Sequence, residues 1–421
     1  MPFTHLIRGG VRRVQLRGMS ALTVRRPSHP LRATIALPRS KSVSNRALII
    51  ASLLGDLSLV SDLSDGDDTR VMRDLLRERP HVMDCGAGGT TLRFLLAWAA
   101  VQEGEEHVIT GIPRLLQRPH DDLVMALKTL GADIEKVPQG FRVRGRRMKG
   151  GYVHFDSPIS SQYLSALVLI APCLEKGLDL KWTGTRLSEP FVSMTLKMLD
   201  HFGVRPSLTM DGVVVPPGRY TRVPYTVPPD WSSAAFWFEQ VALDSGAEVL
   251  LKGLEMDTLQ GDREAAQLWS PWVQRTATPT GMRLQHRAQP GAWPDDPVNL
   301  QHVPDLFQPL AFTLAGRGLK AAMVGLDNLV VKETNRLRAV GDALNALGCT
   351  AGHRAGTFIQ GGRITHKGPF TLDPDIDHRM ALAVAPLALL LESVTITDPD
   401  VVDKSYPGYW DDLRKAGYTL S

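Results

Sequence analysis

The chain has 421 residues, of which 43% are hydrophobic and 22% are charged, and its formal net charge is +4. This length allows two or more domains, and the composition is ordinary for a soluble globular protein. The mild charge does not indicate a nucleic-acid or membrane-surface protein, and the longest apolar run, Met380–Leu391, is too short to span a bilayer. We therefore expect neither nucleic acid nor membrane as a partner, whereas small anionic substrates stay open.

The N-terminus is basic and lacks acidic residues: no Asp or Glu occurs before Asp56, whereas arginines accumulate from Arg8 to Arg32. An Arg-rich, acid-poor start is typical of an organelle transit peptide. It also fits an extension upstream of a start at Met19, and we favour an extension over residues 1–19.

Three cysteines, Cys85, Cys173 and Cys349, lie far apart and form no CxxC pair. This spacing argues against a zinc site or a disulfide framework and fits a reducing compartment. The apolar surroundings of Cys85 and Cys173 predict buried thiols. We expect a cytoplasmic protein without a metal centre.

The first clear helix follows a cluster of serines and cations in "LPRSKSVSNRALIIASLL". Ser40, Ser42 and Ser44 stand beside Lys41 and Arg46 at the start of the apolar run. One interpretation is a helix N-cap with solvated charges. The other is an anion site, because hydroxyls, free N–H groups at a helix start and two cations can together hold a phosphate. The glycines of a Walker A loop are absent.

One unit then recurs along the chain: a strand ending near Gly or Asp, a turn, an amphipathic helix, a stop glycine and another strand. In four copies the stop follows the opening residue by 19 to 23 residues, at Gly131, Gly203, Gly348 and Gly417. These glycines suit left-handed helix C-caps. The segments "LVSDLSDGDDTRVMRDLL" and "LKGLEMDTLQGDREAAQLW" resemble two degenerate copies. Six copies predict an α/β fold of two similar halves.

The boundary between the halves is predicted at "VPYTVPPDWSSAAFWF", where Pro228 and Pro229 precede an apolar helix starting near Ser232. Residues Ser270 to Pro304 are rich in Pro, Gln and His and give a poor helix signal. We interpret them as an irregular excursion within the fourth copy.

Basic and hydroxyl residues recur at the turns that open these units. Each one alone is more typical of a solvated surface charge. Because repeated units present equivalent edges to one face, we expect these side chains to converge on a cleft between the halves and to bind a substrate with several negative charges. They are Lys41, Ser42, Arg46, Arg118, Ser160, Ser161, Gln162, Ser188, Lys332, Arg336, Arg379 and Lys404.

Two carboxylates and a histidine stand among these cations. Asp305 in "VPDLFQPLAF" precedes an apolar helix and could be its N-cap, and Glu333 could be a surface helix charge. Near a substrate they could instead serve as general base and acid. His378 lies beside Arg379 and could join the proton transfers, although a lone histidine of this kind is more often structural.

The motifs "LPRSKSVSNRAL", "SSQYLSAL", "VKETNRL", "DIDHRMA" and "DKSYPGYWDDL" closely resemble the EPSP synthase (3-phosphoshikimate 1-carboxyvinyltransferase) family. The resemblance implies an inside-out α/β barrel of two domains, each with three βαβαββ-type units, and an active site between them. It implies an N-terminal domain over 39–229 and a C-terminal domain made of 20–38 plus 230–421. The first strand, near 22–36, would then belong to the C-terminal domain.

The resemblance also implies the chemistry and its residues. Family enzymes transfer the enolpyruvyl group of phosphoenolpyruvate to shikimate 3-phosphate, releasing phosphate without a metal or organic cofactor, and a monomer is the family-like default. Asp305 would take the proton of the attacking 5-hydroxyl. Glu333 and Lys41, with His378, would handle the proton at the enolpyruvyl methylene carbon. The residues implied for shikimate 3-phosphate are Lys41, Ser42, Arg46, Ser160, Ser161, Gln162, Ser188, Asp305, Asn328 and Lys332, and those for phosphoenolpyruvate are Lys41, Gly89, Arg118, Gln162, Arg336, Arg379 and Lys404.

Two positions depart from the family pattern. Ala87 in "CGAGGTTLRF" stands where an asparagine is usual, and Phe191 in "SEPF" replaces a usual tyrosine. We expect weaker or differently organised substrate binding from these changes. Two alternatives are weighed against the shikimate enzyme: the sister transferase acting on UDP-N-acetylglucosamine, which usually carries a reactive loop cysteine, and a noncatalytic anion-binding relative.

Overall fold

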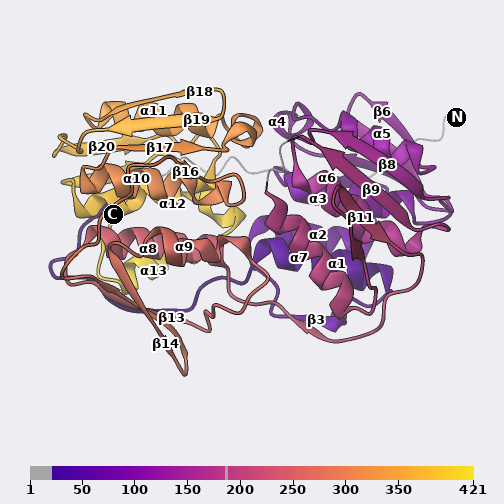
Figure 1. Ribbon diagram of the computed structural model, residues 1–421, viewed down its shortest axis with the longest axis horizontal. Coiled ribbons are helices and arrows are strands. Elements are labelled where there is room, and N and C mark those ends of the chain that lie inside the picture. Colours follow the sequence, from indigo (N-terminus) through magenta and orange to yellow (C-terminus); the bar gives the residue numbers. More distant parts are fainter. Residues whose placement is uncertain (1–20, 185–187) are drawn as a thin grey trace, which may run out of the picture.

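The computed structural model describes residues 21–184 and 188–421, so the extension predicted over 1–19 lies outside the described residues. The chain folds into two lobes of similar construction, shown side by side in Figure 1. Each lobe has its own apolar core. One core runs from Val43 to Val227, and the other combines Val24–Leu37 with residues from Trp231 to Tyr418. We refer to these lobes as the N-terminal half and the C-terminal half.

Five four-stranded sheets share one strand arrangement among the described residues. In each, an outer strand pairs in parallel with its neighbour, and the next two strands add antiparallel. The N-terminal half contains two of these sheets. The first has the strand order β4 (Val82–Asp84), β5 (Glu106–Thr110), β7 (Gly140–Arg144) and β6 (Asp133–Val137). The second has the strand order β8 (Gly151–Asp156), β9 (Leu178–Thr183), β11 (Gly212–Val215) and β10 (Ser207–Leu208). A two-stranded sheet joins β3 (Val60–Ser61) and β12 (Tyr225–Thr226).

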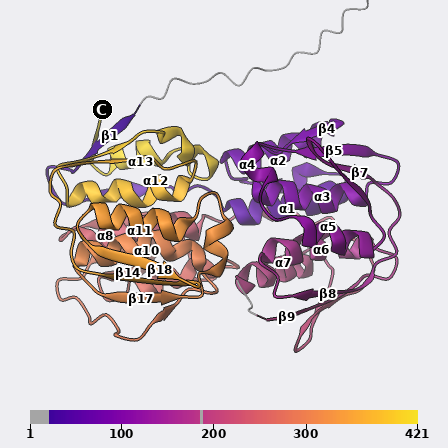
Figure 2. The ribbon, with the colours of Figure 1, turned by 90° about the horizontal axis from the view of Figure 1, so that it is seen from above.

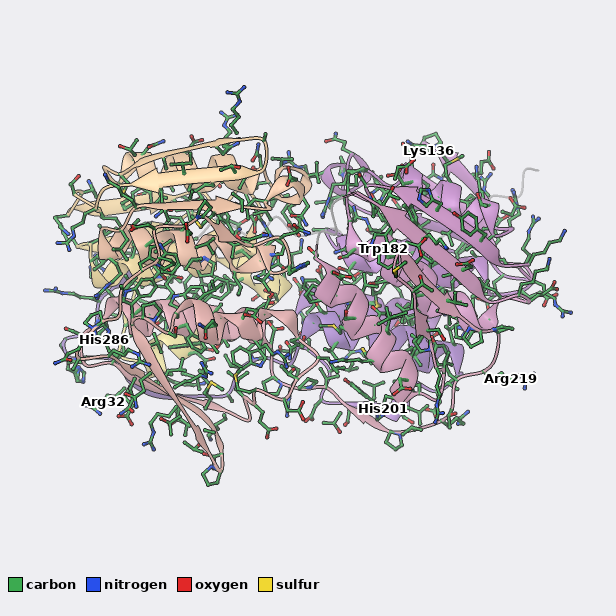
Figure 3. The ribbon with its side chains drawn as sticks, viewed as in Figure 1. Arg32, Lys136, Trp182, His201, Arg219 and His286 are labelled. Atoms are coloured by element: carbon green, nitrogen blue, oxygen red, sulfur yellow. The ribbon has the colours of Figure 1, made fainter. Side chains whose placement is uncertain are left out.

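The C-terminal half contains the other three four-stranded sheets. They are β2 (Arg32–Ile35), β13 (Glu248–Lys252), β15 (Gly281–His286), β14 (Val273–Thr278); β16 (Val298–Asn299), β17 (Ala321–Val324), β19 (Thr357–Gly361), β18 (Thr350–Arg354); and β20 (Pro369–Leu372), β21 (Ser393–Ile396), β1 (Leu22–Arg25), β22 (Thr419–Leu420). In Figure 3, Arg32 and His286 mark the first of these sheets, whereas Lys136, Trp182 and His201 lie on the other lobe. The recurrence of one arrangement confirms the predicted α/β repeat in five units, whereas in the described part of the chain the predicted copy in "LVSDLSDGDDTRVMRDLL" contributes a strand only to the two-stranded sheet of β3 and β12.

Each half encloses three inner helices, which Figure 2 shows grouped within each lobe. Their sequences are apolar on nearly every face, as expected for helices buried all round. In the N-terminal half they are α1 (Lys41–Leu53), α3 (Gly89–Ala100) and α6 (Ser161–Ile170), and in the C-terminal half α8 (Trp231–Leu243), α10 (Phe307–Arg317) and α12 (His378–Val384). Predicted site residues stand at or beside the starts of these helices, including Lys41, Gly89, Ser161, Asp305 and His378.

Amphipathic helices cover the outside, because only one of their faces is apolar. They are α2 (Asp67–Glu78), α4 (Pro113–Leu116), α5 (Asp121–Thr129), α7 (Glu189–His201), α9 (Ala265–Leu268), α11 (Arg336–Ala346) and α13 (Tyr409–Lys415). Short 3-10 turns complete the chain: η1 (Leu57–Leu59), η2 (Ala171–Cys173), η3 (Gly261–Glu264), η4 (Pro304–Leu306), η5 (Asp327–Val331), η6 (Ala385–Leu389) and η7 (Pro399–Lys404).

The stop glycines behave as expected. Gly131, Gly203, Gly348 and Gly417 have φ angles of +108°, +81°, +87° and +98°, in the left-handed region that favours glycine. At Gly203 a side chain would also meet Thr221 Oγ1 at 2.4 Å. Strain and crowding together therefore select glycine there.

The interpretation of Ser270–Pro304 as an irregular excursion is wrong for its first half. Residues 273–286 form the antiparallel hairpin β14–β15, in register from Val273 opposite His286 to Thr278 opposite Gly281. The buried positions Met282 and Leu284 alternate with more exposed ones, which is a strand period. The abundance of Pro and Gln nearby obscured this short alternation.

The two halves are joined by two adjacent crossings of the chain. Arg39 and Pro229 form an antiparallel bridge, Ser40 N donates to Pro228 O at 2.9 Å, and Asp230 N donates to Pro38 O at 2.9 Å. The crossings therefore lie side by side and lead directly into α1 and α8. Any change in the angle between the halves acts at this pair of segments.

Candidate active site

A cavity of about 70 Å³ lies between the two halves. Six cationic side chains and three carboxylates line it, an excess of three positive charges. Sixteen of the predicted site residues form its wall: Lys41, Ser42, Arg46, Gly89, Arg118, Ser160, Ser161, Gln162, Ser188, Asp305, Asn328, Lys332, Glu333, Arg336, His378 and Arg379. Lys404 stands behind the wall, where its Nζ donates to Glu333 Oε1 at 2.8 Å.

The starts of the inner helices explain why these side chains meet. Free N–H groups and the positive end of the helix dipole lie at each helix start, and both attract anions. Ser160 caps α6, and its side chain accepts from Gln162 N at 3.3 Å. Ser40 precedes α1 but makes no capping hydrogen bond through its side chain. The serines of the first motif are therefore not explained by helix capping.

Direct contacts hold the halves together around the cavity. Asn328 Nδ2 donates to Ser188 Oγ at 3.2 Å, and Ser188 N donates to Gln301 O at 2.8 Å. Lys404 Nζ donates to Ala87 O at 3.1 Å, and Arg114 Nε donates to the Glu333 carbonyl at 3.0 Å. The site is therefore in a closed arrangement.

Arg336 is the centre of a buried charge network. It is 2% exposed and contacts Asp377 at 2.7 Å, Glu333 at 2.9 Å and Asp305 at 3.0 Å. Arg379 adds a second cation to Asp305 at 3.0 Å. Asp305 accepts these bonds rather than capping α10, and the Glu333 side chain is only 12% exposed, so neither carboxylate is a solvated surface charge.

These cations determine the protonation of the two carboxylates. Burial opposes the ionised form of Asp305, but Arg379, Lys332 and Arg336 together hold its pKa below the ordinary value. Burial likewise opposes ionisation of Glu333, while Lys404 and Arg336 hold its pKa well below the usual range. Both side chains are therefore ionised at neutral pH. Burial lowers the pKa of Lys332 to about 8.

His378 is neutral and available. Burial, with the nearby charges of Lys41 and Lys404, lowers its pKa well below the usual value. Neither ring nitrogen has a hydrogen-bond partner in the described part of the chain. A buried imidazole with both nitrogens free can meet a polar group of a bound substrate.

Arg46 differs from the other predicted cations. Its guanidinium donates to Thr195 Oγ1 at 2.8 Å, to Ser165 Oγ at 3.1 Å and to the carbonyl oxygens of Ser42 and Phe191 at 2.8 and 3.2 Å. Because Arg46 is buried, its pKa falls to about 9. Arg46 thus ties the start of α1 to α7.

At Gly89, the first residue of α3, the missing side chain leaves room for two arginine side chains. A side chain at Gly89 would lie 2.7 Å from Arg118 Nη1 and 3.1 Å from Arg93 Nη1. Arg93 in turn donates to Gln162 Oε1 at 2.5 Å, and Gln162 Nε2 donates to Thr90 Oγ1 at 3.0 Å. Gly89 therefore lets two arginines gather at one end of the cavity.

Several functional positions escaped the sequence analysis. Asp68 pairs with Lys41 at 2.9 Å, Thr90 and Pro304 line the cavity, and Asp377 holds Arg336. Asp377 was within a quoted motif, "DIDHRMA", but its partner lies 41 residues away in sequence. Asp68 lies in a segment interpreted only as a degenerate repeat. Their roles depend on tertiary contacts that spacing does not show.

Comparison with known proteins adds independent evidence. The family model for EPSP synthase (3-phosphoshikimate 1-carboxyvinyltransferase) matches residues 25–79 and 76–413. The chain belongs to the EPSP synthase family. A 3-phosphoshikimate 1-carboxyvinyltransferase of Bacteroides fragilis is 40% identical over 398 residues, covering 93% of this chain and 96% of the relative. One from Syntrophobacter fumaroxidans is 33% identical over 420 residues, covering 92% and 98%.

Solved structures agree on the fold. The EPSP synthase of Acinetobacter baumannii superposes with a TM-score of 0.74 over 96% of this chain and 100% of that chain, at 20% identity. The two-domain, inside-out α/β architecture predicted for the chain is therefore confirmed. None of the helices in residues 21–184 and 188–421 has the length and apolar character needed to cross a bilayer.

The cysteines separate this chain from the sister transferase. Cys85 and Cys349 are buried, and none of the three cysteines lines the cavity between the halves. Cys173 is exposed, so its prediction as a buried thiol is wrong. It lies in η2, where the chain leaves the core after α6. A reactive cysteine at the site, which the sister family usually has, is missing from the described cavity wall.

Proposed function

We propose that this chain transfers the enolpyruvyl group of phosphoenolpyruvate to the 5-hydroxyl of shikimate 3-phosphate and releases phosphate. The observation that carries the proposal is the cavity between the halves, where an excess of cations surrounds Asp305 and Glu333. Both substrates are small and multiply anionic, as such a site requires. The family membership favours this acceptor over UDP-N-acetylglucosamine.

The two substrates occupy different parts of the cavity in this proposal. Shikimate 3-phosphate contacts the residues around Ser42, Ser161, Ser188 and Lys332. Phosphoenolpyruvate contacts the cluster around Gly89, Arg118, Gln162, Arg336 and Arg379, with Lys404 behind it. Arg46 contributes positive potential and fixes Ser42, because most of its donors are already used by the protein.

The chemistry is an addition followed by an elimination. Lys41 supplies a proton to the methylene carbon of phosphoenolpyruvate while Asp305 takes the proton of the attacking hydroxyl. The resulting tetrahedral intermediate loses phosphate, and Glu333, which is ionised, removes a proton from the methyl group to restore the double bond. Preorganised cations stabilise the departing phosphate, and closure of the halves excludes water.

The domain limits proposed for this enzyme are 39–229 for the first domain and 20–38 with 230–421 for the second. The adjacent crossings at Arg39 and Pro229 support these limits. A monomeric enzyme in the cytoplasm is our further proposal. Light scattering of the purified full chain that gave a dimer mass would contradict the monomer, and fractionation of the source cells would test the location.

The test of the reaction is phosphate release from phosphoenolpyruvate, measured in parallel with shikimate 3-phosphate and with UDP-N-acetylglucosamine. We expect release only with shikimate 3-phosphate. Release with neither acceptor would refute catalysis and favour a noncatalytic anion-binding relative.

The role of Asp305 is tested by Asp305→Asn, with Asp342→Asn on the exposed face of α11 as control. Loss of a general base should reduce kcat by roughly 100- to 10,000-fold, with a smaller change in substrate dissociation constants. The control should keep normal turnover. Near-normal kcat in Asp305→Asn would remove Asp305 as the base.

A further inference from the structure

A second, much smaller cavity lies beside the active site. Its volume is about 10 Å³, close to the space that one water molecule requires. Ser42 and Phe191 line both this cavity and the larger one, so the two spaces adjoin. Six of its nine lining residues have polar side chains, although the surface that faces the space is largely apolar; the lining residues are Ser40, Ser42, Phe191, Met194, Asp230, Ser232, Gln260, Gly261 and Asp262.

Asp262 is a buried carboxyl group of this wall with one of its two oxygens unpaired, and the Ser40 hydroxyl beside the same space also has no partner in the described part of the chain. Asp262 lies on η3, is 3% exposed, and accepts a hydrogen bond from Ser232 Oγ through Oδ2. Oδ1 is buried and has no hydrogen-bond partner in the described part of the chain. A buried carboxyl oxygen without a partner is costly, and a water held in a space of this size beside it would satisfy that oxygen.

The charged groups around Asp262 come from three directions. Asp305 on η4 and Asp230 before α8 are negative, and Arg379 on α12 is positive. Helix α7 presents only Phe191 and Met194 to the small cavity, while its Glu189 and Lys197 line a different groove together with Arg263 and Glu264 of η3. Burial, with the charge of Asp305, raises the pKa of Asp262 to about 7.

We propose that Asp262 is a positioning residue for the acceptor substrate. The Asp262 carboxyl orients the hydroxyl of Ser42 through one water in the small cavity. Ionisation of this carboxyl lowers the affinity of the site for the anionic acceptor. The inference rests on the proposed function, in which Ser42 contacts shikimate 3-phosphate. It adds a residue that touches neither substrate.

The direction of the pH effect follows from the charge. Below about pH 7 the Asp262 carboxyl is neutral, and above it a negative charge lies beside an anion site. The KM for shikimate 3-phosphate should therefore rise between about pH 6 and about pH 8. The expected rise is roughly three- to tenfold, because one negative charge is added at a distance where its repulsion of the substrate phosphate is partly screened. An amide at this position cannot ionise.

The experiment compares wild type, Asp262→Asn and the exposed control Asp257→Asn across that pH range. The phosphate group of the substrate titrates equally in all three proteins, so the informative quantity is the ratio of KM values at each pH. We expect the ratio of wild type to Asp262→Asn to rise with pH, and the ratio of wild type to Asp257→Asn to stay constant. A pH-independent ratio for Asp262→Asn would overturn the inference.

A crystal structure of the wild-type chain with shikimate 3-phosphate tests the water separately. One ordered water bonded to Asp262 and Ser42 would support the positioning role, and a dry cavity would overturn it. This measurement also covers the case in which Asp262→Asn fails to fold. Absence of turnover in wild type would refute the proposed function itself, whereas normal turnover with an unchanged pH ratio would refute only the role of Asp262.

Discussion

Replacement of Arg336 by methionine removes the cation at the centre of the buried network. Asp377, Glu333 and Asp305 would then lose a partner at 2.7, 2.9 and 3.0 Å. Removing one member of a buried ion pair typically costs about 3–5 kcal/mol, because a charge is left uncompensated in a poorly solvated site. We expect Arg336→Met to lose about that much free energy of unfolding at neutral pH.

The loss should depend on pH in a defined direction. The pKa values of Asp305 and Glu333 are held below their unfolded values, so their contribution to stability is present above the unfolded pKa of about 4 and is lost as the pH falls through the folded values. Without Arg336 both folded pKa values rise. The deficit should therefore be largest near neutral pH and shrink in acid, where the carboxylates of the variant become protonated.

Urea unfolding followed by tryptophan fluorescence measures this effect, because six of the eight tryptophans lie in the C-terminal half. Arg338→Met is the matched control: Arg338 is on the same helix but is 76% exposed, and it pairs with Asp342 only at 3.5 Å. Its change should stay within about 0.5 kcal/mol. Equal losses in the two variants, or a deficit of Arg336→Met that grows in acid, would refute the reasoning.

Three further changes have definite expectations. Gly89→Ala places a Cβ 2.7 Å from Arg118 Nη1, so the Arg118 side chain must move away from the phosphoenolpyruvate site. The KM for phosphoenolpyruvate should rise by roughly tenfold or more, while the thermal midpoint stays nearly constant. An unchanged KM would contradict this. Phe191→Tyr adds a hydroxyl at the cavity wall. One additional hydrogen bond to the substrate should lower the KM for shikimate 3-phosphate by roughly two- to tenfold. A higher KM would show that the hydroxyl does not fit. Glu239 is buried, and neither of its oxygens has a partner among the described residues. Burial raises its pKa well above the usual value, so its contribution to stability is lost as the pH rises above the unfolded pKa of about 4. Glu239→Gln should therefore gain more stability at about pH 8 than at about pH 5, and calorimetry that showed the same gain at both would exclude this cause.

The repeat and the inner helices could be predicted because their signals are local. Stop glycines such as Gly131 and Gly417 mark left-handed residues wherever they occur, and the apolar runs after Lys41 and Ser161 have the composition of fully buried helices. Family motifs then identified side chains that the structure brings to one cavity.

The features that escaped prediction depend on distance in space. Asp377 lies in the motif "DIDHRMA" but has no role predicted from the sequence, because its main partner is Arg336 on another helix. Asp262 sits in a poorly repeated segment, and only folding brings it near Asp305. The hairpin over 273–286 was obscured by residues that also favour loops. Pairing partners and charge networks of this kind are set by tertiary packing rather than by sequence period.

Strand β1 pairs with β21 and with β22, and Thr23 exchanges two backbone hydrogen bonds with Ser421 at 2.8 and 3.0 Å. Strand β1 therefore pairs with strands that are synthesised long after it. The N-terminal half has all its described strands once residue 227 has emerged, and β2 can pair once β13 (Glu248–Lys252) has followed, but β1 stays unpaired until β21 (Ser393–Ile396) has been synthesised. We expect nascent chains arrested before β21 to show a protease-resistant N-terminal half beside an unprotected β1, and equal protection of both would contradict this order. The C-terminal half is therefore complete only after β1 has paired with β21, a strand from the other end of the described chain.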